Sequence, residues 1–248
     1  MAVKRNYARY GATTTFFDSV ADFLSSPIPG KGADEAAAVS IHYGAAFMDL
    51  LIEDRGSDST IVLFHAAIDP RQTTLPVFVG RHMVEGIEAN VVYVSDPSLD
   101  HGASIGWFTG DESRPFQDDL TACLNHIFTS FHPDVSASEL GRKAIFFGAS
   151  AGGFAAMYYS HRFPGSLAVV SNPQTHIGRY LEPQVKAYRK KCWSSRKLSE
   201  TTITFDLVTE YSKGFDNYVA YLQNKDDELH YTQHFTPWSQ AVEKYPRQ

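Results

Sequence analysis

Cysteine is scarce in this chain of 248 residues, which contains only Cys123 and Cys192. Two cysteines so far apart exclude a disulfide framework and a cysteine-based zinc site. Lys4 and Arg5 are not followed by the apolar run of a secretory signal, and no apolar run is long enough to cross a bilayer. These absences favour a cytoplasmic protein without a membrane span. Cys123 lies in an amphipathic pattern and is expected in the core.

Basic residues are outnumbered by acidic ones, 22 Lys and Arg against 28 Asp and Glu, for a formal net charge of −6. This balance disfavours a general nucleic-acid-binding protein, and no basic stripe offsets it. The basic cluster at residues 189–197 lies in a polar segment and is expected to be a solvated face. The chain has no dinucleotide fingerprint, P-loop or metal-ligand pattern, so we expect no cofactor and no metal. Nothing in the sequence indicates an oligomeric state.

Short apolar runs alternate with segments of helical periodicity along most of the chain. The runs at residues 61–64, 91–94, 144–147, 167–170 and 218–222 predict buried strands, and residues 38–53 predict a strand pair. Helices are predicted at residues 75–84, 115–131, 183–193 and 205–211, and from residue 231 onward. The alternation is typical of an α/β protein with a mainly parallel, twisted sheet and helices on both faces. Residues 1–35 predict an N-terminal arm or cap, and residues 36–248 the main domain.

The motif Gly148-Ala149-Ser150-Ala151-Gly152 matches G-x-S-x-G and follows a predicted strand directly. A helical pattern of small and apolar residues comes next, beginning with Gly153. In this context the serine occupies a strained strand-to-helix turn that exposes its hydroxyl, and the glycines permit close backbone packing. We predict that Ser150 is a nucleophile. The alternative is that the small residues serve only tight strand–helix packing.

A serine nucleophile needs a histidine base that is oriented by a carboxylate, and in this motif class both follow the serine in the chain. Asp227 follows the strand predicted at residues 218–222, with Asp226 as its near-equal rival. Either could instead cap a helix. His230 lies three residues after Asp227, within reach on a helical turn, and is the predicted base; His234 is the alternative. His161 is expected on the surface, and His176 could face the substrate.

The oxyanion hole is predicted to combine the backbone N–H groups of Ala151 and Ala66. Polar and aromatic residues that follow strands are candidates for substrate binding, because ligands of parallel sheets bind beyond the carboxyl ends of the strands. These candidates are His65, Trp107, Asn172 and Gln174. For His65, a hydrogen-bonded structural role is the alternative.

The chain resembles the α/β-hydrolase superfamily over residues 38–238. The resemblance lies in Phe64-His65-Ala66-Ala67, the serine motif with Gly153, and the acid after Leu222. More narrowly, the chain resembles a bacterial group associated with cell-surface glycans, which includes an accessory protein of glycoprotein secretion systems. That resemblance rests on residues 106–110, residues 171–175, Gln223-Asn224, Asp227, His230 and His234. One departure concerns the histidine, which members of the superfamily usually carry after an eighth strand.

The resemblance implies ester hydrolysis or acyl transfer on a carbohydrate or another small acylated molecule. We expect a serine esterase in which Ser150, His230 and Asp227 form the catalytic triad. An acyltransferase that uses a sugar hydroxyl is one alternative. Another is a binding module without catalysis, in which Trp107 and Phe108 hold a glycan or a protein partner.

Overall fold

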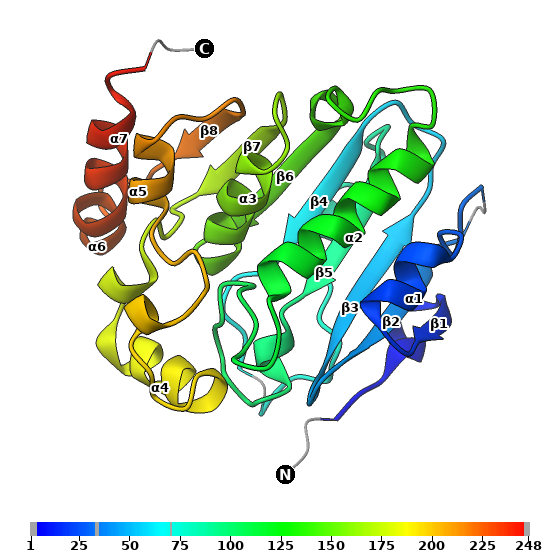
Figure 1. Cartoon of the computed structure of the whole chain (residues 1–248), viewed down its shortest axis with the longest axis horizontal. Helices are drawn as coiled ribbons and strands as arrows, with labels where there is room; N and C mark the ends of the chain where they lie inside the picture. The colour runs from blue at the N-terminus through cyan, green and yellow to red at the C-terminus, as the bar shows by residue number, and fades with distance from the viewer. Residues whose placement is uncertain (1–3, 33–34, 70, 246–248) are drawn as a thin grey trace.

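Eight strands form one twisted sheet in the computed structural model, which describes residues 4–32, 35–69 and 71–245 (Figure 1). The strand order is β1-β2-β3-β5-β4-β6-β7-β8. Strand β3 is antiparallel to both of its neighbours, and every other neighbouring pair is parallel. The bounds are β1 Thr13–Phe17, β2 Ala37–Tyr43, β3 Ala46–Glu53, β4 Thr60–Phe64, β5 Asn90–Ser95, β6 Ala144–Ala149, β7 Leu167–Ser171 and β8 Tyr218–Leu222. The predicted strands and the mainly parallel sheet are confirmed.

Seven α-helices accompany the sheet in the described residues. They are α1 Val20–Ser25, α2 Phe116–Phe131, α3 Ala151–His161, α4 Glu182–Cys192, α5 Leu207–Ser212, α6 Glu228–His230 and α7 Thr236–Val242. A π-helical turn, Tyr231–Phe235, makes α6 and α7 one continuous helical segment. The helices predicted at residues 115–131, 183–193 and 205–211 and in the C-terminal tail are confirmed.

One large core lies between the sheet and the helices, with α2 and α3 crossing the same face of the sheet (Figure 1). Helix α2 buries one stripe, which includes Phe116, Leu120 and Leu124 and is spaced at the helical period. Cys123 belongs to this stripe and is fully buried, as expected. Helix α3 is buried along most of its length because it packs beneath the other helices.

The opposite face of the sheet is covered by residues 75–89 where they pack on β4 and β5. Phe78 and Val84 contact the apolar side chains of these strands there. The helix predicted at residues 75–84 is wrong, since only a short 3-10 turn forms, at Arg81–Met83. Pro76 disfavours helical backbone at Leu75, whose N–H and C=O pair instead with Lys4 and Asn6. Gly80 then adopts a φ of 87°.

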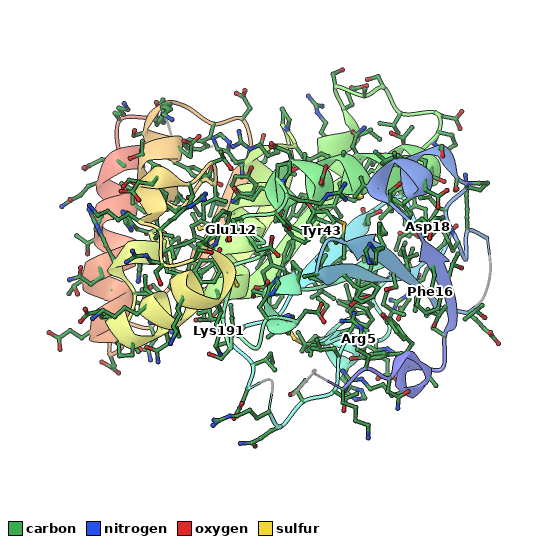
Figure 2. The ribbon with its side chains drawn as sticks, turned by 60° about the horizontal axis from the view of Figure 1, so that its bottom comes forward. Arg5, Phe16, Asp18, Tyr43, Glu112 and Lys191 are labelled. Carbon is green, nitrogen blue, oxygen red and sulfur yellow. The ribbon has the colours of Figure 1, made fainter. Side chains whose placement is uncertain are left out.

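The N-terminal residues are joined to the sheet. Strand β1 pairs with β2 along its whole length, and Phe23 of α1 packs edge-on against His126 of α2. Arg5 forms ion pairs with Asp49 and Asp100 and lies on the side of the molecule that also carries Phe16 (Figure 2). The arm predicted at residues 1–35 therefore adds an edge strand where it is described, and the division at residue 35 stays a prediction. Across the described ranges, none of the helices has the length and hydropathy of a membrane span.

Candidate active site

Ser150 is the single residue between β6 and α3, and its backbone is strained. Its φ of 53° and ψ of −118° are rare for a residue that carries a side chain. A Cβ on Gly148 would lie 2.1 Å from the carbonyl oxygen of Gly152, and one on Gly152 would lie 2.5 Å from the carbonyl oxygen of Phe64. The turn can close this tightly because these positions lack side chains. The structure thus has the strand–turn–helix geometry that the motif predicts.

The loop after β7 wraps around this serine. The backbone N–H of Ser150 donates to the carbonyl of Ser171, and the backbone N–H of Gln174 donates to the carbonyl of Ser150. Nε2 of Gln174 also donates to Oγ of Ser150 at 2.7 Å. Gln174 is therefore attached to the nucleophile candidate through both its backbone and its side chain.

His230 and Asp227 meet at the start of the helical segment after β8. Nδ1 of His230 lies 2.9 Å from Oδ2 of Asp227, although the ring N–H does not point straight at the oxygen. Oδ1 of Asp227 accepts from the backbone N–H of His230 and caps α6. Asp227 thus contacts the imidazole with one oxygen and caps the helix with the other. Burial tends to raise the pKa of Asp227, but the contacts with the His230 ring and backbone outweigh burial and lower it.

His230 approaches the serine through the amide of Gln174. Its Nε2 lies 3.3 Å from Nε2 of Gln174, the same nitrogen that donates to Ser150. Within the described residues, Ser150 Oγ and the imidazole share this amide and are not bonded to each other. Catalytic hydrogen bonds are often long without substrate and tighten only in the complex. Nδ1 faces a carboxylate and Nε2 faces a donor, which matches the tautomer a general base needs.

Asn172 holds the acid in place. Its φ is 40°, its Nδ2 donates to Oδ2 of Asp227 at 3.4 Å, and its Oδ1 accepts from the backbone N–H of Asn224. Asn172 therefore lies against the triad candidates and connects the ends of β7 and β8. Asp226 is exposed, and its backbone N–H donates to Oδ1 of Asn224. Of the two adjacent acids, Asp227 is the one that reaches His230.

The other histidines lie elsewhere. His234 is fully buried, and its Nδ1 accepts from the backbone N–H of Thr175. Burial, followed by the repulsion that His230 exerts when its ring is charged, lowers the pKa of His234 to about 3, so the His234 imidazole stays neutral. His176 lies 4.0 Å from Asp206, and His161 contacts the carbonyl of Gly214. Only His230, among the four candidates, has a contact that leads to Ser150.

The Trp107 loop is buried rather than offered to a ligand. Trp107 and Phe108 are 0% and 1% exposed, and both have a φ of 55°. Asp96 holds this strained turn by accepting from the backbone N–H of Phe108. The indole N–H of Trp107 donates to Oε1 of Gln174 at 2.7 Å. This burial contradicts the substrate-binding role predicted for Trp107 and the alternative in which Trp107 and Phe108 hold a glycan or a protein partner.

His65 has both ring nitrogens engaged with backbone. Nδ1 bonds the carbonyl of Ala66, and Nε2 accepts from the N–H of Asp96. This arrangement fits the structural alternative and leaves neither nitrogen to a substrate. The strand end that carries His65 packs closely on the start of α3, because a Cβ on Gly152 would also lie 2.7 Å from the His65 carbonyl oxygen. Ala66 follows, half-buried, and Ala151 is the first residue of α3, whose N–H has no partner within the helix.

The arrangement around Gln174 could not be read from the sequence. Gln174 was a candidate for substrate binding because it follows a strand, and in the structure it lies between the serine and the histidine. Tyr180, which belongs to none of the sequence motifs, packs its ring 6.0 Å from the ring of His230. Both positions depend on contacts between distant segments, so no local pattern marks them.

No protein-family model matches the chain, and no curated protein sequence is similar to it. Solved structures are similar at low identity. The capsule O-acetyltransferase of Neisseria meningitidis serogroup A is 12% identical, with a TM-score of 0.58 over 82% of this chain and 80% of that one. Dipeptidyl peptidase 4 of Porphyromonas gingivalis is 14% identical, with a TM-score of 0.55 over 84% of this chain and 30% of that one.

MPT51 of Mycobacterium tuberculosis is 11% identical, with a TM-score of 0.51 over 90% of this chain and 84% of that one. At these identities the comparison concerns the fold. The strand order, the helices that connect the parallel strands and the turn at Ser150 fit the α/β-hydrolase fold. This chain has the α/β-hydrolase fold.

Proposed function

We propose that the protein is a serine hydrolase that cleaves a small or carbohydrate-linked acyl ester through an acyl-enzyme. The observation that carries this proposal is the convergence of Ser150, in its strained turn, and the His230–Asp227 pair on one amide nitrogen. A structural serine would need neither a left-handed backbone nor an oriented imidazole.

In the proposed reaction, Oγ of Ser150 attacks the ester carbonyl carbon while Nε2 of His230 takes the hydroxyl proton. Asp227 stabilises the imidazolium through its contact with Nδ1. The bond from the carbonyl carbon to the alcohol oxygen then breaks, and His230 returns its proton to that oxygen. Water repeats the sequence on the acyl-enzyme, with His230 as base, and releases the carboxylic acid.

The developing oxyanion would be held by backbone N–H groups. Ala151 supplies one from the first turn of α3, where the helix dipole also favours negative charge. Ala66 is proposed for the second, because the end of β4 lies against this same turn. One such donor is commonly worth about 10²–10³-fold in turnover.

Acyl transfer to a hydroxyl group is the second candidate. The observation that favours acyl transfer is the structural likeness to a capsule O-acetyltransferase, of which this chain covers 80%. Both reactions use the same acyl-enzyme and differ only in whether water or an alcohol attacks it. The binding-module alternative loses its proposed surface, because Trp107 and Phe108 are buried.

Fluorophosphonate labelling tests the nucleophile without knowledge of the substrate. We expect covalent capture at Ser150 in the folded protein and none in Ser150→Ala, with intact-mass measurement as the readout. A folded wild-type protein that stays unlabelled would remove the hydrolase proposal. Once labelling is established, a panel of simple and sugar esters, with and without a sugar acceptor, separates hydrolysis from transfer.

The base is tested by comparing His230→Asn with His234→Asn. Loss of a general base costs about 10²-fold or more, so p-nitrophenyl ester turnover should fall by at least that factor in His230→Asn. His234→Asn serves as the control, since its buried ring contacts Thr175 rather than Gln174. Equal turnover in the wild type and His230→Asn would contradict the assignment.

A further inference from the structure

The side chain of Gln174 is fully buried at the centre of the site. Oε1 accepts from the indole N–H of Trp107, and Nε2 contacts both Oγ of Ser150 and Nε2 of His230. The backbone N–H of Gln174 is bonded to the carbonyl of Ser150. A glutamine in contact with both members of the nucleophile–base pair needs an explanation beyond substrate binding.

Trp107 decides which way the amide faces. An indole N–H can only donate, so the group opposite it must be the amide oxygen. The NH₂ group is therefore turned toward Ser150 and His230, and its two hydrogens are available for two acceptors. Trp107 is itself fixed by its own burial and by an edge-on contact with Tyr188 at a centroid distance of 5.2 Å.

We propose that Gln174, oriented by Trp107, is the positioning residue of this site: one amide hydrogen bonds Oγ of Ser150 and the other bonds Nε2 of His230. The inference rests on the proposed function, in which these two atoms are nucleophile and base. The amide keeps hydrogen off Nε2, so the ring proton stays on Nδ1 beside Asp227. The bond to Oγ also favours the alkoxide as the serine proton leaves.

The amide is too firmly held to act as a movable gate. Gln174 is closed off from solvent, and its backbone N–H, its Oε1 and its Nε2 are each hydrogen-bonded. Nε2 of His230 has one lone pair, so its bond to the amide must open before it takes the Ser150 proton. Ser150 and His230 are each partly exposed, which leaves both side chains room to turn toward each other. Gln174 then remains as the fixed point between them.

Other titratable groups also face His230. Asp227 and His234 come from its own helical segment, the latter with a ring centroid 5.6 Å away, and Tyr180 faces it from the chain before α4. A substitution at Gln174 leaves all three in place. A change in the His230 titration can therefore be assigned to the amide.

Three variants test the proposal. Gln174→Met removes the donors at similar size, Gln174→Glu replaces the NH₂ group by an oxygen that cannot donate, and Trp107→Phe removes the indole N–H. Gln117→Met is the matched control, because Gln117 is also a buried glutamine, bonded to the backbone of Thr204 away from the serine. The readouts are the fluorophosphonate labelling rate across pH and the NMR titration of the His230 ring.

Gln174→Met should label about 10–100-fold more slowly than the wild type, Trp107→Phe several-fold more slowly, and Gln117→Met at the wild-type rate. Gln174→Glu should move the pKa of His230 and the inflection of the labelling profile to higher pH, because a carboxylate beside the imidazole favours the charged ring. The titration in Gln174→Glu tests the contact between residue 174 and the imidazole. The labelling rate of Gln174→Met tests the positioning role, because a merely structural glutamine would change stability and leave the labelling rate of the folded protein unchanged.

The failures of the two proposals are distinguishable. A labelled wild type with Gln174→Met within twofold of it, at an unchanged inflection, overturns the positioning role alone. An unlabelled wild type overturns the hydrolase proposal, and the NMR titration then decides the amide contact: an unchanged His230 pKa in Gln174→Glu overturns it, and a raised one supports it. Should Gln174→Glu not fold, Gln174→Met and Trp107→Phe carry the test.

Discussion

The turn at Ser150 leaves no space for a side chain at Gly148. A methyl group there would lie 2.1 Å from a backbone oxygen of α3, and backbone atoms of a buried helix cannot move aside cheaply. The same closeness places the start of α3 beneath Ser150. One added carbon atom at Gly148 would therefore be enough to disturb the turn that holds Ser150.

Replacement of Gly148 by alanine tests this packing. Gly148→Ala should lower the free energy of unfolding by about 3 kcal/mol or more, because the clash forces strand and helix apart. Gly11→Ala is the control, since a Cβ on Gly11 would meet nothing within 4 Å and the position differs from open space only by its left-handed φ of 66°. Its cost should be about 1 kcal/mol. Similar urea midpoints for the two variants would contradict the clash.

Among the helices, α6 depends on the carboxylate of Asp227, which also contacts the imidazole of His230. Asp227 caps the helix through one oxygen and contacts the His230 ring with the other. His230 follows Asp227 by three residues, which is about one helical turn, so the cap itself sets the distance from the carboxylate to the imidazole. The stability of the segment and the orientation of the ring are thus coupled through one side chain.

Asparagine and alanine at Asp227 separate these two roles. Asp227→Asn keeps an oxygen for the His230 N–H but loses the charge, so we expect little change in stability and at least about a 100-fold loss of labelling rate. Asp227→Ala should also lose about 1 kcal/mol of stability.

Asp206→Ala is the matched control, because Asp206 caps α5 through the N–H of Thr209. It should lose the same stability and keep its labelling. Wild-type labelling by Asp227→Asn would exclude a catalytic role for this acid.

At the scale of the whole molecule, buried histidines make stability depend on pH. Burial lowers the pKa of five histidines: His65, His132, His161, His176 and His234. As pH falls through the ordinary value of 6.5, the unfolded chain binds protons that the folded chain does not. Their contribution is therefore present above pH 6.5 and is lost toward acid. His101, whose pKa is raised by its bond to Asp111, opposes the trend.

His234 provides the test, because its pKa is lowered to about 3. Between pH 6.5 and pH 5, one such group costs up to about 2 kcal/mol, at about 1.4 kcal/mol per pH unit. His234→Gln should therefore lose less stability over this range than the wild type, as measured by urea unfolding. His82→Gln, at a fully exposed side chain, should follow the wild type. Equal losses in all three proteins would show that His234 does not contribute.

The serine turn could be predicted because strand, serine and helix are consecutive in the chain. Each follows from local chemistry: apolar residues at 144–147, glycines on both sides of Ser150, and a helical pattern after it. The buried strands were predictable for the same reason. The helix expected at residues 75–84 does not form, because Pro76 disfavours helical backbone at Leu75 and because Leu75 pairs with the N-terminal segment, which is remote in sequence.

The buried strands, the serine turn and the place of Asp227 after β8 depend on neighbouring residues, so they can be predicted from the sequence. The different surroundings of His230 and His234, which lie one turn apart, depend on packing between distant segments: His234 contacts Thr175, and His230 contacts the amide of Gln174. The same packing buries Trp107, a candidate for ligand binding from the sequence, and makes it the partner of that amide. Burial and orientation are set by contacts between distant segments, and no local pattern encodes them.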